Sequence, residues 1–383
     1  MILVYEQSVP HYRVKVYEKV GKRLGQKIVV SHGPPRQDAN LKTINSKDRY
    51  TFEDVEVPTW WVGKGVFYIQ NIIPIVRNYE PDFVLIKSAV RSVSFYPLVL
   101  YYKSKNIPVV IWGHGVSRKR EFSPSTSPLD WTHYFYAKMS DSFICYTEKS
   151  QKKLSKYFNE EKFFVANNTI DINSEIEYKK KLDNIGQQEV KSQLCLESKN
   201  NIVFIGRVHK RKKLSVLVDS VRYIQMTKSD DVGLVVIGDG PELDNIIDYA
   251  KRVNLKNAKF VGEKYGKEAG KYLYACDVMV IPSWLGLAVN HAFAYGLPVV
   301  TQKKSSNTDN TNVVGHPPEI CHLIDGKNGI ISDPGYKNLS NSIIAVIKNK
   351  DYYSQYALEY ALGNLTMERM VTGFEEAIEY AKN

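Results

Sequence analysis

The side chains with the clearest chemical potential lie where short apolar runs end in glycine and a polar turn. One such run ends at Gly206 and Arg207, and four cations follow at positions 210–213. Cations at a strand-to-helix turn stand where phosphate groups of a ligand are bound. Arg207 directly follows the glycine that ends the run, so we expect it to meet phosphate. Most of the four later cations are expected to lie in a solvated loop.

Three later segments carry weaker signals of the same kind. Residues 283–287 join an apolar run to a helix, whose first N–H groups form an anion site without a metal. Gly238 belongs either to a tight turn or to a place where backbone approaches a ligand. The match to a dinucleotide fingerprint is weak, because Leu243 stands where the third glycine would be. Glu319 follows two prolines and, taken alone, is a helix first-turn acid.

The N-terminal half holds a second group of polar residues. Tyr12 and Arg13 follow the first apolar run. Arg13 either begins a helix and binds phosphate or pairs with a nearby acid. His114, which follows Gly113 at the end of another run, either acts on a bound ligand or caps the next helix. The tryptophans at 60–61 either bind a ligand or pack in the core, and the core is favoured.

Alternating strand and helix patterns position these residues. The helical patterns include residues 12–24, 66–78, 130–139, 214–225, 242–253 and 287–295. Such alternation indicates an α/β fold with parallel sheets covered on both faces. The predicted strands are residues 2–5, 27–31, 83–87, 108–112, 142–146, 163–166, 201–205, 233–237, 259–261, 278–281, 298–301 and 329–331.

A polar stretch divides this pattern into two Rossmann-like domains. We predict one domain over residues 1–171, a connector over 172–200 with a helix near 187–196, and a second domain over 201–350. Helices over 351–383 could pack on either domain. Ligands bind at the carboxyl ends of the strands in such sheets, so we expect the two domains to face each other across a cleft. The polar loop at 303–312 is a candidate lid.

The net charge limits the class of binding partner, and the cysteines indicate the redox state of the compartment. The chain of 383 residues carries 52 Lys and Arg against 41 Asp and Glu, a net charge of +11. Residues 1–171 contribute 25 basic and 16 acidic side chains, or +9. Such a surplus suits phosphorylated ligands or an anionic membrane, or it serves solubility. Neither a signal peptide nor a membrane-spanning run is expected. The four cysteines suit reduced thiols in or near the core of a cytoplasmic protein.

Taken together, the four segments around residues 201–213, 233–243, 278–301 and 313–331 resemble the donor-binding domain of retaining family 4 glycosyltransferases of GT-B architecture. Residues 12–13, 112–115 and 168–171 fit that family more loosely. The resemblance implies that Arg207 and Lys212 hold the diphosphate of a nucleotide sugar and stabilise the charge that develops on it. Backbone N–H groups of residues 285–287 would add to that stabilisation.

The resemblance also assigns the remaining roles. His114 joins Arg207 and Lys212 as a catalytic residue, which could orient or deprotonate an acceptor hydroxyl or bond the donor sugar. The ligand of the tryptophans at 60–61, if they bind one, would be the acceptor. The donor-binding positions are Gly206, Gly238, Ser283, Leu285, Gly286, Leu287, His291 and Glu319. The acceptor-binding positions are Tyr12, Arg13 and Gly113. No metal ligand and no cofactor is implied, because a suitable Asp-x-Asp motif is lacking and the nucleotide sugar is a co-substrate.

One departure separates this chain from most of the family. Two glutamates eight positions apart are usual, and Ser283 and His291 stand there instead. Neutral imidazole can still form a hydrogen bond with a ribose hydroxyl, whereas serine is too short to replace the first glutamate. The identity of the donor is therefore left open. The helix with histidine is similar to a subgroup among bacterial surface-polysaccharide transferases.

The expected function is transfer of a hexose-type sugar, with retention of configuration, to a hydroxyl of a glycan or lipid-linked acceptor in cell-surface polysaccharide biosynthesis. Two alternatives stay open: a nucleotide-sugar or polysaccharide-binding protein with little turnover, and a GT-B epimerase or phosphorylase. A nucleic acid partner is not expected, because no nucleic-acid module is present. The basic N-terminal half would meet a lipid-linked acceptor at the inner face of an anionic membrane.

Overall fold

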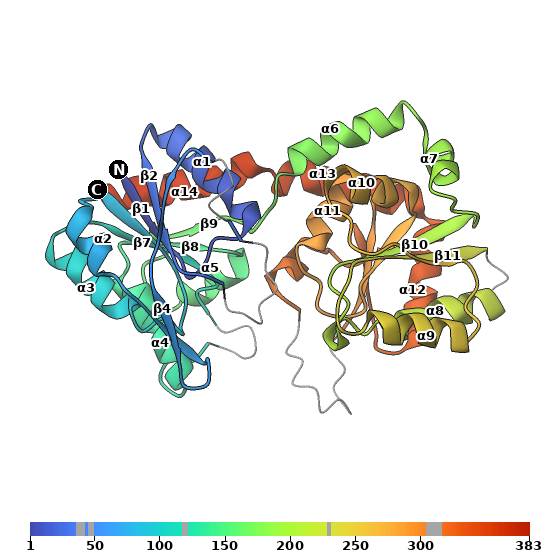
Figure 1. Ribbon diagram of the computed structural model, residues 1–383, viewed down its shortest axis with the longest axis horizontal. Helices are drawn as coiled ribbons and strands as arrows, with labels where there is room; N and C mark the ends of the chain where they lie inside the picture. The colour runs from blue at the N-terminus through green and yellow to red at the C-terminus, as the bar shows by residue number, and fades with distance from the viewer. Residues whose placement is uncertain (36–42, 45–49, 117–121, 228–230, 304–315) are drawn as a thin grey trace. The chain divides into compact units, whose positions relative to one another are not determined.

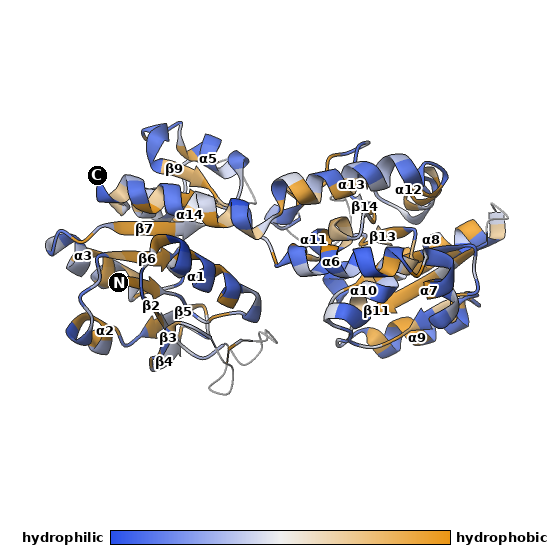
Figure 2. Ribbon diagram, turned by 90° about the horizontal axis from the view of Figure 1, so that it is seen from above, coloured by the Kyte–Doolittle hydropathy of each residue, from blue (hydrophilic) through white to orange (hydrophobic). Residues whose placement is uncertain are grey.

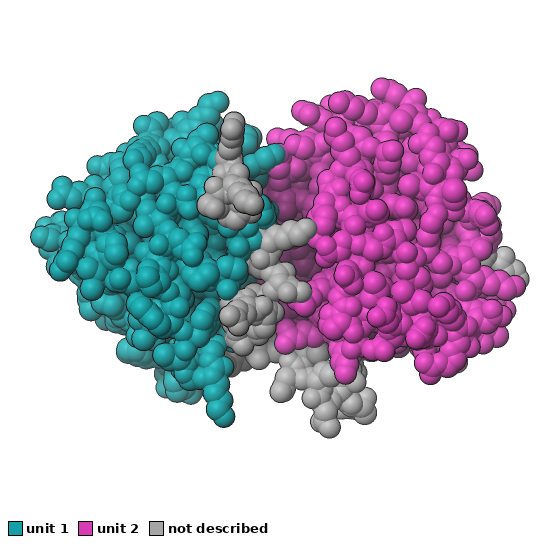
Figure 3. Space-filling view, viewed as in Figure 1, with its two compact units in different colours: residues 1–168, 367–383 teal, residues 169–366 magenta. Residues whose placement is uncertain are grey.

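The computed structural model describes residues 1–35, 43–44, 50–116, 122–227, 231–303 and 316–383. The chain forms two compact units (Figure 3). Unit 1 comprises Met1–Asn168 and Met367–Asn383, and unit 2 comprises Thr169–Thr366. The dividing point lies three residues before the predicted boundary, and the expected C-terminal helices are shared between the units.

Unit 1 is built on a seven-stranded parallel sheet in the order β3-β2-β1-β6-β7-β8-β9 (Figure 1). Its strands are β1 (Ile2–Tyr5), β2 (Ile28–His32), β3 (Glu53–Glu56), β6 (Phe83–Lys87), β7 (Val109–Gly113), β8 (Ser142–Cys145) and β9 (Phe163–Val165). A separate antiparallel hairpin pairs β4 (Thr59–Val62) with β5 (Phe67–Gln70). The helical segments are α1 (His11–Leu24), α2 (Ile73–Asn78), α3 (Phe95–Ser104), α4 (Pro128–Met139), α5 (Glu148–Leu154), η1 (Glu160–Lys162) and α14 (Met367–Lys382).

Period-2 alternation in the strands gives this sheet two apolar faces. Ile2 and Val4 of β1 point into a core that α1 and α14 cover, whereas Leu3 and Tyr5 point into a core that α3 and α4 cover. Buried strands of this kind are continuous apolar runs in the sequence, and Figure 2 shows most of β7 in orange. This burial explains why the parallel strands of the sheet centre were predictable.

Unit 2 is built on a six-stranded parallel sheet in the order β12-β11-β10-β13-β14-β15. Its strands are β10 (Asn200–Ile205), β11 (Val232–Ile237), β12 (Ala258–Phe260), β13 (Val278–Val280), β14 (Val299–Gln302) and β15 (Gly329–Ser332). The helical segments are α6 (Ile172–Asp183), α7 (Gln187–Gln193), η2 (Lys210–Lys212), α8 (Leu214–Thr227), α9 (Leu243–Arg252), α10 (Gly266–Ala275), α11 (Ala288–Ala294), η3 (Pro318–His322), α12 (Tyr336–Lys348) and α13 (Lys350–Asn364). Chain order reverses between β10 and β13, and such a switch point is where open α/β sheets bind ligands.

Several expectations need correction. Residues 66–78, predicted as one helix, form β5 and the short α2, because alternate side chains along β5 face opposite sides. The edge strand β3 and the hairpin strand β4 were not predicted. The expected connector carries α6 and α7, both of which belong to unit 2. All but the first residue of the candidate lid at 303–312 lie outside the described residues.

Burial also corrects two expectations about side chains. Cys145 and Cys276 are buried and free, as expected, whereas Cys195 and Cys321 are exposed. Cys195 follows the end of α7 in a left-handed conformation, and Cys321 lies in η3, so neither reaches the core. Trp60, for which core packing was favoured, is 54% exposed. Among the residues that the structure describes, none of the helices combines the length and apolar character needed to cross a bilayer.

Candidate functional site

The switch point of unit 2 brings the loop after β10 to the loop after β13. Gly206 directly follows β10 with a φ of 137°, and the side chain of Lys212, in η2, returns toward it. The Nζ of Lys212 lies 3.8 Å from where a Cβ of Gly206 would stand and donates a hydrogen bond of 2.7 Å to the Trp284 carbonyl. Lys212 therefore links both loops at the position where an α/β sheet binds its ligand.

Burial makes Lys212 electrostatically unusual. Its side chain is buried, and desolvation lowers the pKa of its amine to about 8, against a smaller opposing effect of the Glu319 carboxylate. Glu319 is itself buried in η3. An anionic ligand near Nζ would favour the charged form of the lysine again. Binding of a phosphate beside the Lys212 amine and protonation of that amine therefore favour each other.

Arg207 stands apart from this buried contact. Its side chain is exposed, directly after Gly206, and forms no hydrogen bond or ion pair with the described part of the chain. Arg211 lies above the Trp284 ring, with its Cζ 5.4 Å from the ring centroid. The five donors of a guanidinium suit a diphosphate, and Arg207 has them available.

His316 fixes the loop after β13, and sequence patterns did not point to it. Its Nδ1 accepts a 3.1 Å hydrogen bond from the Leu285 N–H, and its Nε2 donates to the Gln302 carbonyl at 2.7 Å. Because a carbonyl only accepts, Nε2 carries the proton and the ring is neutral. Burial, together with the charge of Lys212, holds the pKa of His316 below its ordinary value. The Leu285 N–H, expected to face an anion, is thus engaged within the protein.

The two positions that depart from the usual glutamates lie on either side of this loop. Ser283 and His291 are both half-buried. The Nδ1 of His291, on α11, contacts the Glu175 Oε1 from α6, and the other carboxylate oxygen of Glu175 is buried without a hydrogen bond. The chain therefore supplies a carboxylate beside His291 from a different helix. The sequence pattern did not reveal this pair, because 116 residues separate its members.

The glycine turn after β11 has a packing role. Gly238 has a φ of 139°, and a Cβ there would lie 2.0 Å from the Gly206 carbonyl oxygen. A Cβ at Gly240 would likewise lie 2.2 Å from the Val208 carbonyl oxygen. These glycines let the loops after β10 and β11 pack backbone against backbone. Gly238 thereby supports Gly206 whether or not it also touches a ligand.

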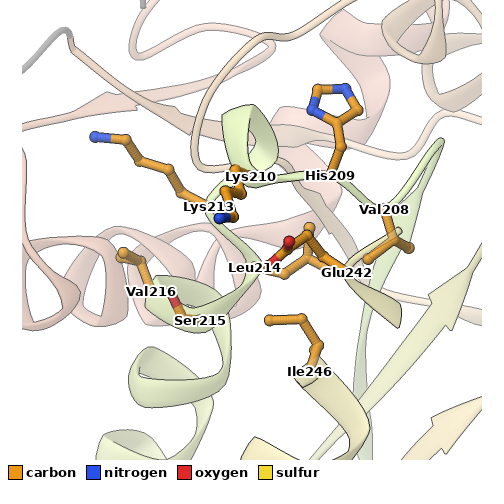
Figure 4. A pocket seen from close by; sticks show the side chains of 9 residues that line it. All are labelled: Val208, His209, Lys210, Lys213, Leu214, Ser215, Val216, Glu242 and Ile246. Atoms are coloured by element: carbon orange, nitrogen blue, oxygen red, sulfur yellow. The ribbon is translucent and has the colours of Figure 1, made fainter. Parts of the chain in front are cut away.

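A pocket of about 280 Å³ opens beside these loops, lined by Val208, His209, Lys210, Lys213, Leu214, Ser215, Val216, Glu242 and Ile246. Figure 4 shows Glu242 and Ile246 facing the turn that carries Lys210. Burial and the neighbouring cations lower the pKa of His209 in this pocket. Its lining includes neither Arg207 nor Lys212, so it adjoins the switch point without containing the two predicted catalytic cations.

In unit 1, the carboxyl edge of the sheet gathers a cluster around Tyr146. Arg13, at the start of α1, is 2% exposed, and its Nη2 donates a 2.7 Å hydrogen bond to the Tyr146 hydroxyl. Its guanidinium carbon lies 4.1 Å from the Trp112 ring centroid and 5.2 Å from that of Tyr12. The Nε and Nη1 of Arg13 are buried without a hydrogen bond. Arg13 is therefore held by aromatic rings and a phenol.

Two further residues complete this cluster. Lys87, at the end of β6, also donates to the Tyr146 hydroxyl and lies 3.7 Å from a carboxylate oxygen of Glu6. His114 packs edge-on against Tyr146, with ring centroids 4.8 Å apart. Gly113 has a φ of 152°, and a Cβ there would lie 2.9 Å from the Cβ of Ser88. The structure thus brings Arg13 and His114 together through Tyr146, which the sequence did not single out, and Tyr12 joins them through the Arg13 guanidinium.

No metal site is evident in the described ranges, where no three His, Cys, Asp or Glu side chains gather as ligands.

Histidine burial in unit 2 predicts acid sensitivity. Burial lowers the pKa of His322, in η3, to about 4, so the folded state keeps this ring neutral while the unfolded chain takes up a proton below pH 6.5. The contribution of His322 to the free energy of unfolding is therefore fully present above pH 6.5. It is lost as the pH drops toward 4, by about 3 kcal/mol. Urea unfolding at several pH values should show this slope. His322→Gln should flatten it and the exposed His11→Gln should not; an unchanged slope in His322→Gln would contradict the assignment.

Comparisons with known proteins agree with this architecture. Residues 187–360 match the family described as Glycosyl transferases group 1. The chain is 25% identical over 294 residues to an uncharacterized glycosyltransferase of Methanocaldococcus jannaschii, which spans 72% of this chain and 70% of that protein. It is 27% identical over 163 residues to the 2-deoxystreptamine N-acetyl-D-glucosaminyltransferase of Niallia circulans, 39% of each chain.

Solved structures resemble the chain over its whole length. A glycosyltransferase from Rickettsia africae superposes with a TM-score of 0.73 at 14% identity, covering 100% of this chain and 98% of that one. HepE from Anabaena in complex with UDP gives 0.68 at 17% identity, with 99% of each chain covered. WaaG, a glycosyltransferase involved in lipopolysaccharide biosynthesis, gives 0.61 at 14% identity, covering 97% of this chain and 98% of that one. At such identities the likeness shows the fold.

Proposed function

We infer from the group 1 glycosyl transferase domain at residues 187–360, and from the GT-B fold that the whole chain shares with solved glycosyltransferases, that this protein is a glycosyltransferase. We propose that it moves a sugar from a nucleoside diphosphate to a hydroxyl of a glycan or lipid-linked acceptor, with retention of configuration, in cell-surface polysaccharide biosynthesis. The observation that carries the proposal is Lys212, a buried cation joining the two loops of the switch point. HepE, which has this fold, was solved with UDP and with UDP-glucose, and this supports a nucleotide-sugar donor.

Protein cations take the role that a metal would otherwise fill. As the bond between sugar and diphosphate breaks, negative charge grows on the leaving phosphate, and charges fixed beforehand stabilise it without rearrangement. Lys212 would meet that phosphate from the buried side and Arg207 from the exposed side. The N–H groups of Gly286 and Leu287 would add to the site, and His316 holds their loop through Leu285.

The pair of His291 and Glu175 would bind the ribose. With its Nδ1 engaged by Glu175, the ring of His291 presents Nε2 to a hydroxyl. The carboxylate that most relatives carry on the helix itself is in this way replaced by one from α6. Ser283, being short, leaves room where the first glutamate would contact the donor sugar.

The acceptor would bind at the carboxyl edge of the unit 1 sheet. His114, whose ring packs edge-on against Tyr146, would orient or deprotonate the attacking hydroxyl. Tyr12, Arg13 and Gly113 form the surroundings of that edge.

The experiment is a transfer assay with a panel of UDP-, GDP-, ADP- and TDP-sugars and lipid-diphosphate glycan acceptors, run in excess EDTA. We expect transfer from at least one donor, undiminished by the chelator, with a product whose anomeric configuration by NMR equals that of the donor. An inverted product would overturn retention, and activity lost in EDTA would overturn metal independence. Donor binding in calorimetry without transfer would favour a binding protein, and consumption of donor without acceptor would favour an epimerase or phosphorylase.

A further inference from the structure

The β4–β5 hairpin of unit 1 presents an apolar face to the outside. Trp60 lies opposite Ile69, and Val62 lies opposite Phe67. These four side chains, called the hairpin face below, are between 37% and 54% exposed, and Val66 in the turn is 48% exposed. Scattered exposed apolar residues are ordinary, but four that pair directly across two strands form one continuous surface.

The opposite face of the same hairpin is firmly anchored. Tyr68 and Gln70 are buried, and Trp61 packs on Tyr68 with ring centroids 5.2 Å apart. The Gln70 backbone exchanges hydrogen bonds of 2.8 Å with the Ser94 hydroxyl, which donates to its carbonyl and accepts from its N–H. The hairpin face is thus held outward by specific contacts on the inner side, and is not simply a loose loop.

The charges beside the hairpin face indicate which kind of partner surface it could bind. Lys64 stands exposed in the turn of the hairpin, and no acidic residue occurs from position 57 to 79. In the stretch that follows the hairpin, Arg91 is also exposed. The Tyr68 N–H bonds to the Arg91 carbonyl, so part of that stretch lies directly beside β5. An apolar face flanked by the exposed cations Lys64 and Arg91 complements an anionic surface with an apolar interior.

We propose that the hairpin face is a membrane-docking surface that inserts into the headgroup layer of an anionic lipid bilayer. Tryptophan prefers the boundary between headgroups and acyl chains, and Lys64 would contact the phosphates. The hairpin follows β3, so it rises from the carboxyl edge of the sheet, the edge that carries Arg13 and His114. Docking on a bilayer goes beyond the proposed function. The corollary that the acceptor is lipid-linked rests on the proposed function.

The test is flotation of the full chain with phosphatidylglycerol vesicles and with phosphatidylcholine vesicles, at low and high salt. We expect binding to the anionic vesicles only, weakening as salt rises.

Trp60→Ser with Phe67→Ser should reduce binding about tenfold or more, and Lys64→Glu about tenfold. Matched controls lie in unit 2: Leu362→Ser, where the leucine is 51% exposed on α13, and the exposed Lys337→Glu on α12. Both controls should bind like the parent.

The outcomes separate this inference from the proposed function. Donor binding in calorimetry reports on unit 2 and should be unchanged in every variant. Thermal unfolding of the hairpin variants should show that unit 1 is folded as in the parent. Absence of binding to phosphatidylglycerol, or equal binding by hairpin variants and controls, would overturn docking while leaving glycosyl transfer intact. A parent dimer in sedimentation velocity that the paired Trp60 and Phe67 substitution converts to a monomer, without lipid binding, would assign the surface to a second copy of the chain instead.

Discussion

Replacement of Lys212 with methionine is expected to lower kcat by about 10²- to 10³-fold, the range observed when one preorganised donor to a developing oxyanion is removed. Methionine keeps the length of the aliphatic chain without the charge. Since Lys212 is buried, the desolvation cost that methionine avoids should offset the lost hydrogen bond to the Trp284 carbonyl, and the free energy of unfolding should stay about the same. Initial rates with the identified donor, together with thermal unfolding, measure both effects.

The pH dependence gives Lys212 a second signature. With a pKa of about 8, this amine loses its charge as the pH rises through 8, so donor affinity should fall above that pH. A bound diphosphate favours the charged form, so binding at pH 8.5 should take up a proton. Calorimetry in buffers of different ionisation enthalpy measures that uptake, which Lys212→Met should abolish.

The matched control is Lys210→Met, two residues earlier in the same turn and exposed. It should retain kcat within about threefold, because an exposed cation is largely screened by water. Equal losses from both substitutions would mean that the turn acts through its overall charge. An unchanged kcat in Lys212→Met would remove this residue from the mechanism.

The strands at the centre of both sheets were predictable for a definite physical reason. Parallel strands covered on both faces are apolar along their length, and helices with one apolar stripe separate them. At the edge of unit 1 this rule fails. The strand Glu53–Glu56 has three acidic residues among four, as suits an edge that water reaches, and its sequence resembles a loop. The hairpin was missed because its outward side chains are apolar.

Some residues of the candidate site were predictable from the sequence and others were not, for a similar reason. Arg207 and Lys212 adjoin a glycine turn, and a short stretch of chain is enough to place them at the end of β10. His316 and Glu175 act through partners 31 and 116 residues away, so only the folded chain brings them to Leu285 and His291. Tyr146 likewise joins elements distant in the sequence. Residues that reach a site from elements distant in the sequence leave no short motif in the sequence by which they could be recognised.

Two glycines of the donor loops separate packing from ligand contact. Gly238→Ala is expected to lower the free energy of unfolding by about 4 kcal/mol or more. Its Cβ would stand 2.0 Å from a backbone oxygen of Gly206, and its φ of 139° strains any other residue. Neither backbone can move without breaking the bond from the Gly206 N–H to the Ile237 carbonyl. Denaturant unfolding measures the loss directly.

Gly286→Ala is the matched substitution with the opposite expectation. A Cβ at Gly286 meets no atom within 4 Å, so the fold should lose less than about 1 kcal/mol. If the N–H groups of this loop receive the diphosphate, the added methyl group crowds the ligand, and donor affinity should fall about tenfold or more. Calorimetric titration of both variants with the nucleoside diphosphate tests the pair. A destabilised Gly286→Ala, or unaltered donor affinity in that variant, would mean that the loop after β13 does not approach the donor, and a stable Gly238→Ala would mean that the loops after β10 and β11 are free to separate.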